Sequence, residues 1–202
     1  MRRTLPYMTA ALLLSLTVAT AAWALTPTET VKSSVDQALQ SLSQISAGTP
    51  EGAERRRAEI RRVADSLFDF TEMSRRALGR HWADRTDAER DEFVRLFTDL
   101  MARSYIGKID RYAGEAIAYL GERVDGDEAS VQSQVVTAKG SQIPVEYRLH
   151  RVNDAWTAYD VFVENVSLVG TYRSQFDRVI KSESFPSLLK RLREKGQVAD
   201  AR

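Results

Sequence analysis

The sequence predicts an α+β fold of one domain, with helices packed on one face of a four-stranded antiparallel sheet. Up to about residue 109 the apolar residues recur three and four positions apart, which is typical of amphipathic helices. From residue 116 to residue 163 they alternate with polar residues, which is typical of strands with one buried face. Helical spacing returns after residue 167. This order indicates layers within one domain rather than alternating βαβ units.

The first 24 residues have the three parts of a secretory signal peptide. Two arginines at positions 2 and 3 precede an apolar run over residues 8–16, and Ala-Trp-Ala at residues 22–24 matches an A-x-A cleavage site. The apolar run is too short and too weakly apolar for a good membrane span. We therefore expect export, cleavage after Ala24 and a mature domain of residues 25–202.

The mature chain is nearly neutral and contains no cysteine. Of the 29 lysines and arginines, two lie in the signal peptide, which leaves 27 basic against 28 acidic residues and a net charge of −1. This balance gives no electrostatic footprint for binding nucleic acid. Because there is no disulfide framework, the 178 mature residues must be stabilised by packing alone. The composition suits a bacterial periplasm, where a cysteine-free chain avoids mispaired disulfides.

Capping signals mark the helices of the first half. Residues 26–29 (Thr-Pro-Thr-Glu) and 86–89 (Thr-Asp-Ala-Glu) are capping boxes, and the first has proline at the first helical position. The helix that starts at Thr26 is expected to stop at residues 48–50, Gly-Thr-Pro. An arginine-rich helix and a short helix that ends at Gly79 follow before the second capping box.

The helix that starts at Thr86 is the best-specified element. Its apolar face is formed by Phe93, Phe97, Leu100, Met101, Tyr105 and Ile109. Asp91 with Arg95, and Asp99 with Arg103, are expected to form ion pairs four residues apart on another face.

Four strands are expected in the second half, over residues 116–123, 129–138, 142–151 and 155–163. The third alternates most regularly, because Ile143, Val145, Tyr147 and Leu149 share one face while Glu146, Arg148 and His150 share the other. Two helices, at about residues 167–181 and 184–195, are expected to close the chain.

Residues with catalytic potential are scarce. His81 and His150 stand in no metal-ligand spacing, and no nucleophile elbow, P-loop or dinucleotide fingerprint occurs. Asp160 lies inside the last predicted strand, on the face of Trp156, Ala158 and Phe162. A buried acid in a pocket would resemble the base of a small NTF2-like enzyme, whereas a hydrogen-bonded structural carboxylate is the simpler interpretation. We expect no catalytic residue, no metal and no cofactor.

Two further patterns have a plain and a functional interpretation. The arginines between residues 55 and 62 could dock an anionic partner, but the interleaved glutamates favour a solvated helix face. The surplus of large apolar residues could be ordinary core or the lining of a pocket, and periodicity alone does not separate these.

A resemblance to one family favours the pocket. Residues 160–180 contain Val-Glu-Asn-Val-Ser-Leu and then Tyr-Arg-Ser-Gln-Phe, a run that strongly resembles the signature of the MlaC family. Further matching blocks are residues 68–74 with 77–79 and Trp82, helix residues 93–105, and residues 188–193. The resemblance spans essentially the whole mature chain. The family, also called the toluene-tolerance auxiliary family, is the periplasmic lipid-binding component of the Mla ABC transport system.

The resemblance implies a monomeric lipid carrier with an apolar cavity between the helices and the sheet. It would shuttle lipid between an outer-membrane lipoprotein–porin complex and an inner-membrane ABC transporter complex. Because the family includes hopanoid-associated HpnM members, the cargo is either a phospholipid or a hopanoid. The residues expected to contact it are Phe93, Phe97, Leu100, Met101, Tyr105, Ile109, Tyr147, Leu149, Tyr159, Val161, Val166, Leu168, Tyr172 and Phe176.

Two other classes of protein remain open at this point. One is an NTF2-like enzyme that acts on a small hydrophobic substrate with Asp160 as its base and a tyrosine as partner. The other is an interaction module that binds no lipid and whose apolar face is merely core.

Overall fold

A computed structural model describes residues 25–45, 48–109, 114–137 and 139–200, so the predicted signal peptide lies outside the described residues. The helices are α1 (Pro27–Gln44), α2 (Pro50–Leu67), α3 (Phe70–Leu78), the 3-10 turn η1 (Gly79–Trp82), α4 (Asp87–Ile109), α5 (Leu168–Ser182) and α6 (Phe185–Asp200). The strands are β1 (Ala116–Asp125), β2 (Glu128–Val136), β3 (Gln142–Val152), β4 (Ala155–Val163) and β5 (Val166–Ser167). The predicted α+β class is confirmed.

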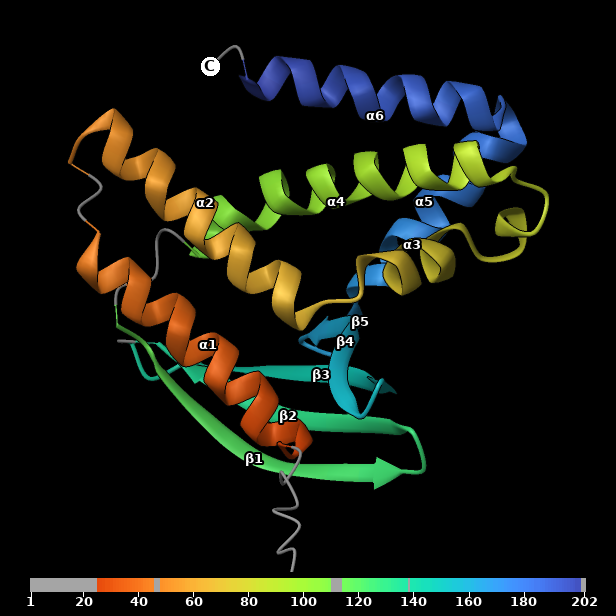
Figure 1. Cartoon of the computed structure of the whole chain (residues 1–202). Coiled ribbons are helices and arrows are strands. Elements are labelled where there is room, and N and C mark those ends of the chain that lie inside the picture. Colours follow the sequence, from red (N-terminus) through yellow and green to blue (C-terminus); the bar gives the residue numbers. More distant parts are fainter. Residues whose placement is uncertain (1–24, 46–47, 110–113, 138, 201–202) are drawn as a thin grey trace, which may run out of the picture.

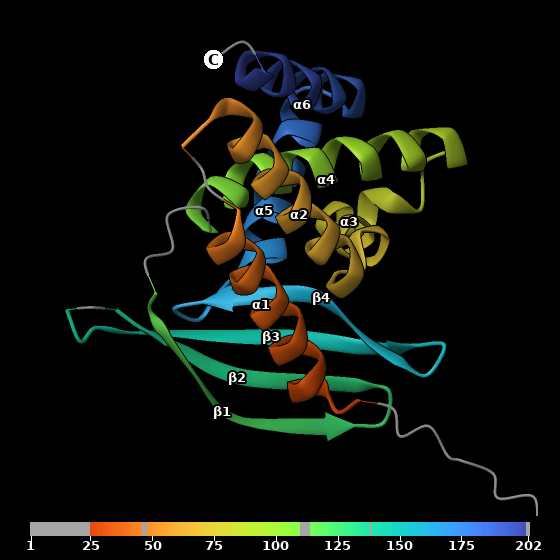
Figure 2. The same ribbon diagram turned by 60° about the vertical axis from the view of Figure 1, so that its left-hand side comes forward.

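The strands form one antiparallel sheet in the order β1-β2-β3-β4-β5. Helix α1 crosses one face of this sheet, whereas α3 and α5 pack against β4 (Figure 1, Figure 2). Over the described residues the sheet therefore has five strands where the sequence predicts four. The extra strand has two residues and returns after a tight turn at Glu164 and Asn165, whose φ angles are 51° and 64°. A strand this short shows no alternation, so no periodicity could reveal it.

The predicted starts of α1 and α4 and the end of α3 agree with the structure because the capping signals are used. The predicted end of α1 is wrong: α1 ends at Gln44, and Thr49 and Pro50 are instead the N-cap and first residue of α2. Thr26 and Glu29 form the reciprocal hydrogen bonds of a capping box at the start of α1. Thr86 and Glu89 do the same before α4, since each side chain accepts a hydrogen bond from the other residue's backbone N–H. Helix α3 ends at Gly79, whose φ of 55° suits glycine.

The predicted ion pairs of α4 are wrong in their partners. Asp99 pairs with Arg61 of α2, and Arg95 lies 3.8 Å from Glu92. Local spacing permits the predicted pairs, but packing brings a second helix close enough to compete for Asp99.

The buried side chains of the part of the chain that the structure describes form two clusters. The first joins α3, α4, α5 and α6 around Phe93 and Phe97, which are stacked with ring centroids 5.7 Å apart and meet Phe176 edge-on. The second joins α1 to the sheet and includes Val31, Leu149 and Ala158. The N-terminal part of the apolar face of α4 thus packs against α5 and α6 rather than against the sheet.

A β-bulge decides which residues of β4 face the helices. Leu149 pairs with Ala158 but Arg148 pairs with Asp160, so Tyr159 is an extra residue on β4. Directly paired residues point to the same side of a sheet, so Ala158 faces α1 with Leu149, while Asp160 points with Arg148 to the opposite side. The expectation that Asp160 shares a face with Trp156 and Ala158 is therefore wrong. A strict period of two cannot anticipate the inserted residue.

Candidate functional site

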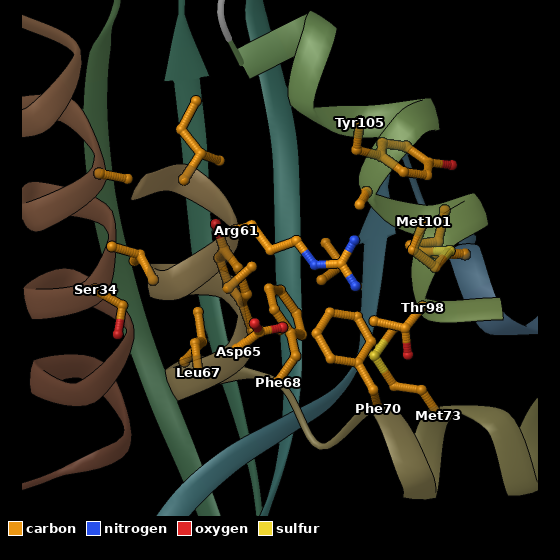
Figure 3. Close-up of a pocket in the computed structure, with 18 of the residues that line it drawn as sticks. Ser34, Arg61, Asp65, Leu67, Phe68, Phe70, Met73, Thr98, Met101 and Tyr105 are labelled. Atoms are coloured by element: carbon orange, nitrogen blue, oxygen red, sulfur yellow. The ribbon is translucent and has the colours of Figure 1, made fainter. Parts of the chain in front are cut away.

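A pocket of about 280 Å³ lies between α1, α2 and α4 on one side and β3 and β4 on the other (Figure 3). Its wall is formed by Ser34, Val35, Ala38, Ile60, Arg61, Val63, Ala64, Asp65, Leu67, Phe68, Phe70, Met73, Thr98, Met101, Ala102, Tyr105, Tyr147, Val161, Val163 and Leu168. The pocket separates the α3–α6 cluster from the α1–sheet cluster. It is thus a place where the two cores do not meet.

The wall of the pocket is almost entirely apolar. Its polar members are Ser34, Arg61, Asp65, Thr98 and the hydroxyls of two tyrosines. An apolar cavity of about 150 Å³ is enough to bind benzene, so this pocket takes an apolar group of roughly twice that size. Hydrophobic lining with a few polar groups is the usual composition of a ligand site.

The structure places the fourteen residues expected to contact lipid in three kinds of position. Those that line the pocket are Met101, Tyr105, Tyr147, Val161 and Leu168. Those that belong to the packed clusters are Phe93, Phe97, Leu100, Leu149, Tyr159 and Phe176, with Tyr172 partly buried against them. Val166 is 61% exposed. The side chain of Ile109 lies outside the described residues.

The sequence reasoning missed the contribution of α1, α2 and α3 to the wall. The apolar stripe of Ile60, Val63, Ala64 and Leu67 is visible in the sequence, but periodicity does not tell which neighbour a stripe meets. Arg61 is also part of the wall, so the interpretation of the arginine run as wholly solvated is wrong at this position.

The tyrosines around the pocket are held in their neutral form. Burial raises the pKa of Tyr147 to about 12. Burial and the neighbouring Tyr172 raise the pKa of Tyr105 to about 12 as well. Tyr119, on β1, does not line the pocket but packs against the α1–sheet cluster; its buried hydroxyl has no hydrogen-bond partner among the described residues, and burial raises its pKa.

We expect Tyr147→Phe to make the protein more resistant to alkali. Above about pH 10 the unfolded chain loses the tyrosine proton while the folded chain keeps it, so the free energy of unfolding falls as the pH rises toward 12. The variant lacks this contribution and should gain up to about 2 kcal/mol on the wild type over that interval. Urea unfolding at pH 8 and at pH 11 measures the difference. Equal losses in both proteins would contradict it.

Asp160 acts as a cap for α5. Its Oδ1 accepts hydrogen bonds from the N–H groups of Val161 (2.8 Å) and Val169 (3.0 Å), and its Oδ2 accepts one from Ser167 Oγ (2.5 Å). Ser167 is itself the N-cap and accepts a hydrogen bond from the N–H of Gly170. Both carboxylate oxygens of Asp160 are therefore hydrogen-bonded near the start of α5, and the side chain does not line the pocket.

We expect Asp160→Ala to lower the free energy of unfolding by about 2 kcal/mol, because it leaves two backbone N–H groups and a hydroxyl without their charged acceptor. Asp160→Asn, which keeps one oxygen, should cost less. Lipid occupancy should stay within a few fold of wild type in both. Chemical denaturation and lipid extraction measure the two effects, and loss of a turnover in a folded variant would instead favour an enzyme.

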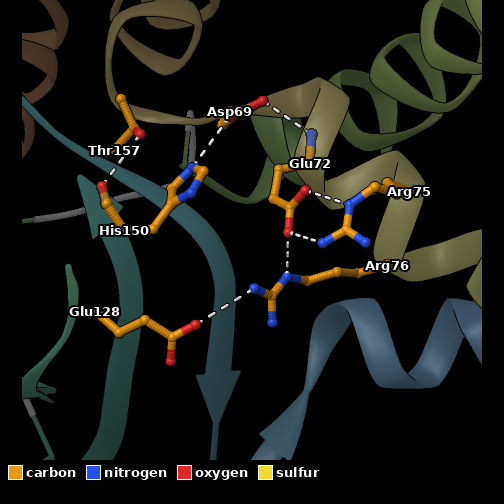
Figure 4. Close-up of polar contacts among 7 residues, drawn as sticks. All are labelled: Asp69, Glu72, Arg75, Arg76, Glu128, His150 and Thr157. Atoms are coloured by element: carbon orange, nitrogen blue, oxygen red, sulfur yellow. Dashed lines mark hydrogen bonds and ion pairs between the residues drawn. The ribbon is translucent and has the colours of Figure 1, made fainter. Parts of the chain in front are cut away.

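The polar residues on the far side of β3 and β4 hold α3 in place (Figure 4). His150 Nε2 lies 3.1 Å from Asp69 Oδ2, and Asp69 caps α3 through its other oxygen. Glu72 pairs with both Arg75 and Arg76. These contacts explain His150 as a structural residue.

His81, within the 3-10 turn η1, has a similar role. It lies 2.9 Å from Asp177 of α5. Hydrogen bonds from Lys181, Arg80 and His81 hold the pKa of Asp177 well below its usual range. Among the described residues no three histidine or carboxylate side chains gather as a metal site would need, and no helix there is long and apolar enough to cross a membrane.

A small α+β domain with an apolar pocket between two cores is a ligand-binding domain for a hydrophobic group. The MlaC protein family matches residues 32–194, which is most of the chain. The chain belongs to the MlaC family. This is a family of non-enzymatic lipid-binding carriers, so the expectation that the protein is not an enzyme is confirmed by its membership.

A solved structure supports the same conclusion. The chain is similar to a phospholipid-binding protein from Ralstonia solanacearum whose structure was determined in complex with a phospholipid. The sequence identity is 25%, the TM-score is 0.72, and the match covers 85% of this chain and 97% of the other. The two proteins therefore share their fold over nearly their whole length.

Proposed function

We propose that this protein is a periplasmic phospholipid carrier that holds acyl chains in the pocket between α1, α2, α4 and the sheet. The observation that carries the proposal is the apolar pocket in a chain of the MlaC family. A relative of the same fold binds a phospholipid, which supports that class of cargo. The pocket-lining residues of the α4 face and the sheet, together with those of α2, are the proposed lipid contacts.

An apolar pocket suits a protein that carries lipid through an aqueous compartment. Each CH₂ of a lipid tail exposed to water costs about 0.8 kcal/mol, so a lipid very rarely leaves a membrane for water without a carrier. We propose that the carrier, a monomer, exchanges lipid between an outer-membrane lipoprotein–porin complex and an inner-membrane ABC transporter complex. Release requires a partner that offers the tails another apolar surface, because tight binding alone moves no equilibrium.

The proposal is tested by native mass spectrometry of the mature protein purified without detergent. We expect a co-purified phospholipid, identified by fragmentation after extraction. A hopanoid in its place would make the protein a carrier of polycyclic lipid. A protein that stays empty after incubation with phospholipid vesicles would contradict the carrier function.

Residues 1–24 are proposed to be removed on export. The expected mature protein begins at Leu25, and intact-mass measurement of the protein from the periplasmic fraction checks this. A membrane-bound product that retains Met1 would contradict it.

A further inference from the structure

One cation stands in the wall of the apolar pocket. Among the described residues, Arg61 is the only lysine or arginine that lines it. Its side chain extends from α2 across the pocket toward Thr98 and Met101 of α4 (Figure 3). It is 39% exposed, so the guanidinium sits where the apolar wall meets solvent.

The present partner of Arg61 is Asp99 of α4. The Arg61 Nη2 to Asp99 Oδ1 distance is 2.9 Å, and the Asp99 side chain is 29% exposed. An ion pair as exposed as this is weakly held, because water screens it. Arg61 can therefore exchange Asp99 for another anion at little cost.

A phosphate is the anion that suits this position. Guanidinium groups bind phosphate oxygens through two parallel hydrogen bonds, and they lose less hydration on binding than an ammonium does. In a phospholipid the phosphate lies only a few bonds from the acyl chains. A lipid with its tails in the pocket therefore brings its phosphate close to the rim that Arg61 occupies.

We propose that Arg61 binds the phosphate of the lipid headgroup, releasing Asp99, and so selects phospholipids over lipids without a phosphate. This inference rests on the proposed carrier function and names the headgroup chemistry of the same site. Two carboxylates, Asp65 and Asp99, face the same rim. They disfavour a headgroup of net negative charge, so a zwitterionic phospholipid is the appropriate probe.

The test is a competition between two lipids with identical tails. Delipidated mature protein is offered phosphatidylethanolamine and the matching diacylglycerol in equal amounts from cyclodextrin complexes, and native mass spectrometry measures the ratio bound. We expect wild type to prefer the phospholipid by about tenfold, which is the effect of one good charge-assisted contact. Arg61→Gln should bring the ratio of bound phospholipid to bound diacylglycerol close to one. Arg61→Lys keeps the positive charge but not the two parallel hydrogen bonds of the guanidinium, so its ratio should lie between those of wild type and Arg61→Gln.

Two variants separate headgroup binding from a structural tie. Arg62→Gln is the matched control, because Arg62 is the next residue of α2 but is exposed and pairs with Glu59 of its own helix. It should keep the wild-type ratio. Asp99→Asn breaks the ion pair but leaves Arg61 free to bind phosphate, so it should keep or raise the ratio.

Several outcomes would overturn the proposal. If Asp99→Asn and Arg61→Gln lose the preference together, or if Arg61→Gln keeps it, the ion pair serves only to join α2 to α4. A wild-type protein that loads both lipids equally contradicts the role of Arg61 while leaving the carrier function intact. A wild-type protein that loads neither contradicts the carrier function itself. Thermal unfolding of each variant shows that the ratios come from folded protein.

Discussion

Ala102→Trp is expected to abolish lipid loading while the protein remains folded. Ala102 lines the pocket from α4 and is only partly buried. An indole ring at this position occupies a large part of the roughly 280 Å³ that the lipid tails would fill. Because the indole would enter space that the pocket-lining side chains do not fill, the free energy of unfolding should change by less than about 1 kcal/mol. Lipid extraction and urea unfolding of the delipidated protein measure the two quantities.

The same substitution elsewhere on α4 provides the control. Ala88 is exposed in the first turn, so Ala88→Trp should leave both loading and stability unchanged. Leu149→Trp should behave in the opposite way, because Leu149 is 0% exposed in the α1–sheet cluster and overpacking there costs about 1–3 kcal/mol. If Ala102→Trp retained full lipid occupancy, the tails would have to bind somewhere else.

Phe97→Ala is expected to cause the largest loss of stability, about 3–5 kcal/mol. Phe97 is fully buried, and its ring meets Tyr172 at 5.3 Å and Phe176 at 5.6 Å between centroids. Its removal leaves a cavity at the junction of α4 and α5, which the surrounding side chains are expected to fill only in part. Urea denaturation at neutral pH measures the change.

The control for Phe97→Ala is Leu120→Ala. Leu120 is 59% exposed on β1, so its truncation should change the free energy of unfolding by less than about 0.5 kcal/mol. If Phe97→Ala cost no more than this, Phe97 would line a space available to ligand instead of the packed core. In that case the sequence-based assignment of Phe97 as a lipid contact would gain support.

Features that depend on neighbours in the chain were predictable from the sequence. The capping boxes at Thr26 and Thr86 and the stop at Gly79 define helix ends through hydrogen bonds within four residues. The alternation of β3 correctly places Tyr147 and Leu149 on the helix-covered face, because side chains on a strand alternate by geometry. The family was also recognisable, since its signature runs through consecutive residues.

What the tertiary structure alone decided is which apolar face becomes core and which becomes pocket. Phe97 and Met101 lie one turn apart on α4, yet the first packs against α5 and the second lines the pocket, because α5 and α6 cover only part of the helix. The bulge at Tyr159 turns Asp160 away from α1 and toward the start of α5, and Asp99 pairs with Arg61 from a distant helix. These outcomes depend on contacts between residues far apart in the chain, and local periodicity contains no information about which elements meet.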